Sequence, residues 1–274
     1  MPRKSEMPAM VMDHAKMTFA EMERFHTLDL DVAARLRPIW RLELEEHILQ
    51  NIIHILLSKP RKNQAALTTA EKDAFNAAVN AAMADNTYQQ FPAIHAQPHM
   101  MHGFMGWNGT LRFLAWHREF LYQMERVLQQ HVPGVTIPYW DWANDHSLPS
   151  WVMLPAGVTR GPDTTRHLPS QSDVTSTVLN AGDYITMTQN LESYHNTVHM
   201  FVGGNTMPYP SISPRDPMFW LHHANVDRLW AQWQAGAGHA GLNPPLSGTD
   251  AVLDPWTATS SDVLDTYNLW YYYA

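Results

Sequence analysis

Two pairs of histidines constrain this chain more than any other feature of its sequence. His195 and His199 are four residues apart, and the neighbours His222 and His223 follow on an aromatic-rich segment. Residues at positions i and i+4 lie on one face of an α-helix, so His195 and His199 can bind one metal ion together. A histidine from the later segment can complete a site of three imidazoles. The pattern therefore predicts a metal site between a helix and a second segment.

The residue types around these histidines narrow the choice of metal. Ligation by histidine alone suits copper, zinc or nickel. The chain has no cysteine, which excludes disulfides, thiolate metal sites and cysteine nucleophiles. A zinc protease helix of this spacing carries glutamate directly after its first histidine, where this chain has Asn196. The sequence therefore argues against a zinc protease.

The motif resembles the second copper-binding half of the tyrosinase family, the type-3 dicopper proteins. The resemblance also rests on Val202-Gly-Gly and on the run from Asp216 to Trp230. It implies that the ligands of one copper are His195, His199 and His223. His222 is about 100° away from His223 around a helix, so it is expected beside the site rather than on the metal.

The resemblance predicts a first copper half earlier in the chain. Residues 88–95 and 112–121 resemble the family's segments for the first and third ligands, and residues 135–142 match the strand-like segment that follows. The implied ligands are His95 and His117. Two copper ions with dioxygen as co-substrate are then expected. The expected fold is mainly α, a type-3 copper four-helix bundle core with long loops and few short strands.

The middle ligand of the first copper departs from the family pattern. Most relatives have a histidine nine positions before His117, where this chain has Asn108. An amide oxygen is a poor ligand for copper(I). We therefore predict that His102 takes this place, delivered by a loop made flexible by Gly103, Gly106 and Gly109. The alternatives are His99, and a true Asn108 ligand or a vacant position.

The resemblance also implies a proton acceptor. Hydroxylating a monophenol requires deprotonation of a group whose reference pKa is about 10. The family assigns this step to a water held by an asparagine and a glutamate, here Asn196 and Glu192. The alternative for Glu192 is an acid in the first turn of a helix, favoured there by the helix dipole.

Three further residues are expected around the coppers. Asp227 lies one turn after His223, where it accepts a hydrogen bond from an imidazole or forms a surface ion pair with Arg228 or Arg118. Met200 and Met207 are expected at the entrance. Met200 is apolar and adaptable, which favours uncharged or weakly charged phenols as substrates.

These expectations together predict an enzyme. It uses dioxygen to oxidise o-diphenols to o-quinones and to hydroxylate monophenols at the ortho position. One alternative is a catechol or o-aminophenol oxidase without activity on monophenols. A second alternative, of another class, is an oxygen-binding protein like the hemocyanins, which share this dicopper site.

Composition excludes several partners. The net charge of the 274-residue chain is −8, which argues against nucleic acid and against an anionic membrane surface. The N-terminus has no apolar stretch typical of a signal peptide and no twin arginine. The chain is therefore expected to stay in the cytoplasm, or to leave the cell with a signal-bearing partner that also delivers copper. The oligomeric state is left open.

Hydrophobic periodicity predicts one mainly helical domain. The helices are expected over residues 31–57, 69–83, 88–95, 111–130, 189–201 and 217–234, with long loops over residues 143–182. We predict that residues 1–58 form a helical extension packed on the core. Residues 59–274 are expected to form the dicopper catalytic domain as a single folding unit.

Overall fold

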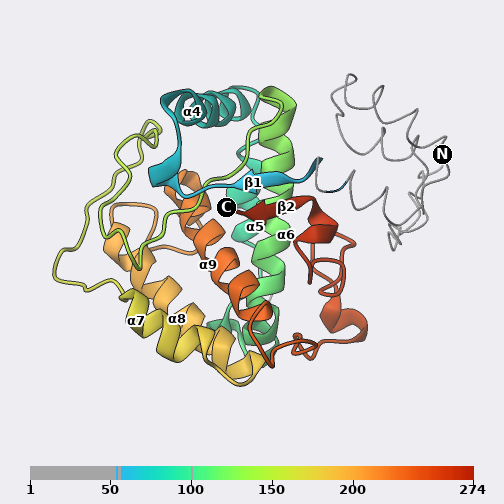
Figure 1. Ribbon diagram of the computed structural model, residues 1–274. Helices are drawn as coiled ribbons and strands as arrows, with labels where there is room; N and C mark the ends of the chain where they lie inside the picture. Colours follow the sequence, from blue (N-terminus) through green and yellow to red (C-terminus); the bar gives the residue numbers. More distant parts are fainter. Residues whose placement is uncertain (1–53, 55–56, 100) are drawn as a thin grey trace, which may run out of the picture. The chain divides into compact units, whose positions relative to one another are not determined.

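The computed structural model describes residues 54, 57–99 and 101–274 (Figure 1). The chain divides into two compact units: Met1–Lys59 with Thr266–Tyr272, and Pro60–Asp265 with Tyr273–Ala274. The helix expected over residues 31–57 and nearly all of the expected extension lie outside the described residues, so the proposed domain division stays a prediction. Every candidate site residue belongs to the second unit.

This second unit is mainly helical, which confirms the expected fold class. Its longer helices are α4 (Thr69–Ala84), α5 (Gln90–His95), α6 (Trp107–His131), α8 (Tyr184–Val202) and α9 (Met218–Gln234). The described strands are short: β1 (Lys59–Arg61) pairs with β2 (Tyr271–Tyr273). Among the described residues, no helix combines the length and apolar character needed to cross a bilayer.

Helix α6 is the centre of this unit. It packs against α4, α8 and α9, and α8 packs against α9 (Figure 1). Periodicity predicted one buried face, but every residue from Gly109 to Leu121 is buried. A helix buried on all sides belongs to the core of a fold. The side chains of α6 can therefore contribute to a site that is closed to bulk water.

Local sequence signals explain where the helices begin. Thr68 and Glu71 form a capping box at the start of α4. Asp183 accepts a hydrogen bond from the Thr186 amide and begins α8 five residues earlier than periodicity indicated. Gly106 precedes α6 with a φ of 116°, a conformation that glycine adopts readily. As a result α6 begins at Trp107 rather than at residue 111.

The connecting segments are long, as predicted, but not wholly irregular. The short helix α7 (Gln171–Val174) and the π-helical turn η4 (Thr175–Leu179) interrupt the stretch over residues 143–182. Residues 135–142 form no strand, although Tyr139 makes a single parallel bridge to Asn63. The expected strand-like segment is therefore an extended connection that follows α6.

Candidate metal centre

The first group of histidines combines two helices and a loop. His95 is the last residue of α5, His117 lies in the middle of α6, and His102 precedes the 3-10 turn η3 (Gly103–Met105). All three are buried, and one ring nitrogen of each lies within 4.8 Å of the others. The Nε2 atoms of His95 and His117 are 3.4 Å apart. The structure thus brings together the three residues predicted for the first copper.

The route by which His102 reaches this group differs from the expectation. The flexible loop from residue 102 to residue 117 does not exist, because α6 begins at Trp107. Gly109 is instead a point of close approach, where a Cβ atom would lie 2.0 Å from the carbonyl oxygen of His102. The absence of a side chain at Gly109 therefore lets the backbone of His102 rest against α6.

Helical geometry separates Asn108 from the first group. Asn108 lies in the first turn of the same continuous helix as His117. Nine residues of α-helix turn by about 900°, which places the two side chains on opposite sides and roughly 13 Å apart along the axis. His99 stacks on Trp116 with ring centroids 5.9 Å apart and is not part of the group. Of the residues considered for the middle position, His102 is the one that lies in the first group.

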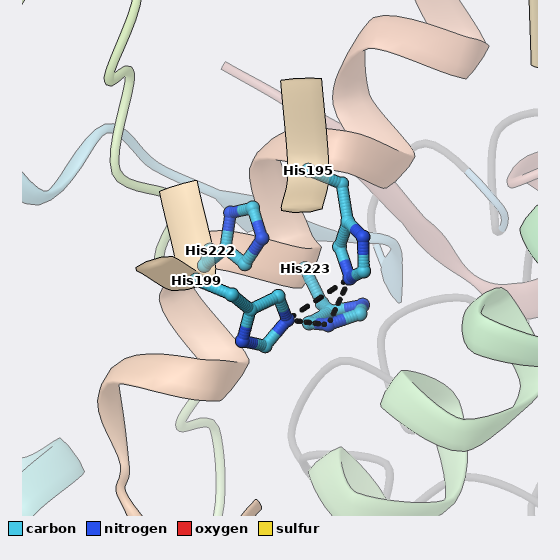
Figure 2. A group of neighbouring side chains, drawn as sticks. All are labelled: His195, His199, His222 and His223. Atoms are coloured by element: carbon cyan, nitrogen blue, oxygen red, sulfur yellow. Dashed lines mark hydrogen bonds between the residues drawn. The ribbon is translucent and has the colours of Figure 1, made fainter. Parts of the chain in front are cut away.

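The second group lies between α8 and α9 (Figure 2). Its Nε2 atoms form a triangle: His199 to His195 at 2.9 Å, His195 to His223 at 3.1 Å, and His199 to His223 at 3.2 Å. His222 is also buried close by, and its ring stacks on that of His195 with centroids 5.0 Å apart. In Figure 2 no hydrogen bond joins His222 to the three rings of the triangle.

Backbone carbonyls fix the tautomers of several of these rings. The Nδ1 atoms donate to carbonyl oxygens: His95 to Pro210 at 2.5 Å, His117 to Phe113 at 2.7 Å, and His199 to Met207 at 2.9 Å. A neutral imidazole that donates through Nδ1 carries no proton on Nε2. The converging Nε2 atoms of these rings therefore present lone pairs to one another, an arrangement that repels unless a cation lies between them.

Burial favours the neutral form of five of these rings. Removal from water lowers the pKa of His199 to about 3 and the pKa values of His95, His117, His195 and His223 well below the ordinary value of 6.5. Neighbouring imidazoles lower them further. The neutral imidazole is the form of histidine that binds a metal.

The two groups face each other. The ring of His117 stacks on that of His223 with centroids 4.6 Å apart, and His102 stacks on His195 at 5.7 Å. Each pair joins one residue of the first group to one of the second. Phe219, four residues before His223 on α9, also stacks on His223 at 3.9 Å. Two metal ions held by these groups would be immediate neighbours.

The candidate proton acceptors lie on α8 beside the second group. Asn196 is exposed, and its Oδ1 accepts a hydrogen bond from His195 Nδ1 at 3.2 Å. Glu192 is buried in the interior of α8, so the alternative of an acid in the first helical turn is wrong. Its Oε1 accepts from the amide of Gly103 at 2.8 Å.

The remaining predicted residues divide between entrance and support. Met200 is exposed next to His199, and its place at an entrance stays a prediction, whereas Met207 is buried and contributes its carbonyl to His199. Met207 therefore supports His199 through its backbone rather than through an exposed side chain. Asp227 forms an ion pair with Arg118, one of the two alternatives, but the pair is buried rather than on the surface.

Sequence reasoning did not identify the groups that orient the imidazoles. The carbonyls of Phe113, Met207 and Pro210 act through the backbone, so their side chains carry no signal of this role. Phe219 had a usable signal, because a residue four positions before a ligand shares its helix face.

These features define the class: a helical protein with two facing, buried groups of histidines. Comparison with known proteins gives the same answer. The family model "Common central domain of tyrosinase" matches residues 85–160 and 156–236. A tyrosinase from Streptomyces glaucescens is 33% identical over 268 residues, covering 75% of this chain and 95% of that protein. The chain belongs to the tyrosinase family.

Other relatives share the fold. Hemocyanin 1 of Megathura crenulata is 36% identical over 222 residues, 66% of this chain but 6% of that protein. A functional unit of octopus hemocyanin superposes with a TM-score of 0.63 at 26% identity, over 79% of this chain and 68% of the unit. A polyphenol oxidase from Thermothelomyces thermophila gives a TM-score of 0.58 at 20% identity, over 79% of this chain and 89% of its own.

Proposed function

We propose that this chain is a dicopper oxidase that uses dioxygen to oxidise o-diphenols to o-quinones and to hydroxylate monophenols at the ortho position. The observation that carries the proposal is the convergence of imidazole nitrogens in two buried groups that face each other. One copper would be held by His95, His102 and His117, and the other by His195, His199 and His223.

The donor sets fit copper. In the second group the nitrogens are 2.9–3.2 Å apart, close to the separation expected for nitrogens bound to one ion at about 2.0–2.1 Å each. Three neutral imidazoles without thiolate or carboxylate suit copper. When bound, the copper pair supplies the activation of dioxygen for phenol oxidation.

The residues of the chain then handle the phenol proton. The Oδ1 atom of Asn196 is taken by His195, which leaves the amide NH2 free to donate. Glu192 lies one turn earlier on the same face of α8. Together they would hold a water molecule that accepts the proton of a monophenol, and a small, uncharged or weakly charged phenol would enter past Met200.

A copper count tests the ligand assignment. Reloaded with copper and dialysed, the wild-type chain should hold close to two copper ions. His102→Ala should lower this number towards one, whereas Asn108→Ala should leave it unchanged. The reverse pattern would overturn the assignment of the middle ligand.

Turnover tests the reaction. The copper-loaded protein should oxidise catechol and, after priming with a trace of diphenol, also p-cresol. Turnover of catechol without any turnover of p-cresol would indicate a catechol or o-aminophenol oxidase instead. Reversible oxygen binding without turnover of either phenol would indicate that the protein is an oxygen carrier. We further propose that a separate copper-delivery protein loads the chain, in the cytoplasm or during joint export.

A further inference from the structure

Glu192 makes a contact that its proposed part in proton transfer does not explain. It lies on α8, the helix of the second copper group, yet its carboxylate reaches the segment that carries His102 of the first. Its Oε1 accepts the Gly103 amide hydrogen at 2.8 Å and lies 3.5 Å from His102 Nδ1. The carboxylate is buried, with a relative side-chain exposure of 9%.

His102 is held differently from the three histidines of the site that have backbone carbonyl partners. His95, His117 and His199 each donate Nδ1 to a backbone carbonyl. Within the described part of the chain neither ring nitrogen of His102 has a hydrogen-bond partner, and its backbone is not helical. Besides ring contacts such as the stack on Phe104, the polar group closest to its Nδ1 is the Glu192 carboxylate.

The packing around Gly103 supports this arrangement. A Cβ atom there would lie 2.9 Å from Glu192 Oε2 and 2.9 Å from Thr110 Oγ1. A side chain at this position would collide with the carboxylate in the place where it receives the amide hydrogen. Gly103 thus leaves the space in which Glu192 and the backbone beside His102 meet.

We propose that Glu192 is a positioning residue for His102. It anchors the segment through the Gly103 amide and faces Nδ1, which leaves Nε2 of His102 for the first copper. The inference rests on the proposed dicopper function and deepens it, because the helix of one metal group then sets a ligand of the other. The positioning role of Glu192 can be separated from its proposed role in proton transfer. Anchoring the segment needs only an acceptor oxygen, whereas proton transfer needs the carboxylate.

Copper binding to the metal-free protein tests the proposal without relying on activity. Glu192→Ala should reduce the copper retained against a chelator from two ions to about one, with the affinity of the lost ion about 10–100-fold lower. Glu192→Gln keeps an acceptor oxygen for Gly103 and should retain both. Gly103→Ala, which displaces the carboxylate from the other side, should reproduce the loss seen in Glu192→Ala.

Ser193→Ala, at the exposed neighbouring position on α8, is the matched control and should bind copper like the wild type. Circular dichroism of the metal-free variants checks that each remains folded. Two copper ions bound by Glu192→Ala with wild-type affinity would overturn the proposal. Failure of the wild type to bind two coppers would instead contradict the proposed function, so the two failures are distinguishable.

Discussion

Gly109 is the residue of α6 against which the backbone of His102 packs. Its missing side chain lets the carbonyl of His102 lie against α6, where a Cβ atom would come within 2.0 Å. Backbone atoms cannot yield to such a contact as the end of a flexible side chain can. Position 109 is therefore restricted to glycine for a steric reason, although alanine has the higher helix propensity.

We predict that Gly109→Ala costs the protein one copper ion. Alanine is the better helix former by about 1 kcal/mol, so helix propensity cannot account for a loss. Copper analysis after dialysis should give about one ion per chain. Gly182→Ala, at a glycine with open space around it, is the control and should retain two. Wild-type copper affinity in Gly109→Ala would show that the segment has another way to reach the site.

At the scale of single residues, the sequence predicted which histidines come together but not the groups that orient them. His195 and His199 followed from helical spacing, and His117 from its motif. The approach of His102 to Gly109 could not be predicted, because glycines in a segment of unknown structure indicate flexibility and close packing equally. The carbonyl partners were beyond prediction because every residue has the same backbone.

Between elements, a buried ion pair ties α6 to α9. Arg118 follows His117 on α6, and Asp227 lies one turn after His223 on α9. The Asp227 carboxylate accepts hydrogen bonds from Arg118, from Arg61 at 3.3 Å and from Tyr273 at 2.5 Å. The link therefore sets the register of two helices that each carry a ligand of a different metal group.

Asp227→Asn should destabilise the metal-free protein by about 3–5 kcal/mol, because it leaves buried guanidinium groups without a full counter-charge. Urea unfolding of the apo form measures the change. Asp73→Asn, at an exposed position on α4, should stay within about 0.5 kcal/mol of the wild type. An equally small effect for Asp227→Asn would mean that packing alone aligns the two helices.

Hydrophobic periodicity located the main described helices but misjudged their ends. The start of α8 was missed because its first turn is set by the Asp183 cap rather than by an apolar pattern. The burial of α6 on all sides was also hidden, since residues such as Arg118 and Glu119 look like a solvated face until tertiary partners bury them.

Across the larger unit, the two histidine groups draw on α5, α6, α8 and α9 at once. A metal bound only by the native state stabilises that state by mass action, by about 2.7 kcal/mol at a free concentration one hundred times the dissociation constant. Copper is therefore expected to stabilise the packing of these four helices against one another.

Removing copper should lower the melting temperature by roughly 5–10 °C. Differential scanning calorimetry with copper and with a chelator measures the difference. His131→Ala, which removes a histidine that pairs with Asp85 away from the site, should keep the full copper-dependent shift. An unchanged melting temperature in a protein that binds two coppers would mean that the metal does not distinguish the native from the unfolded chain.

The segment between α8 and α9 limits how relatives of this chain can diverge. Its carbonyls at Met207 and Pro210 each orient a histidine, one in each group. An insertion or deletion between these two positions would shift both metal sites together. The side chain of Tyr209 between them is exposed and can be exchanged freely. Change in this segment should therefore proceed by side-chain replacement at constant length, in nature and in engineered libraries alike.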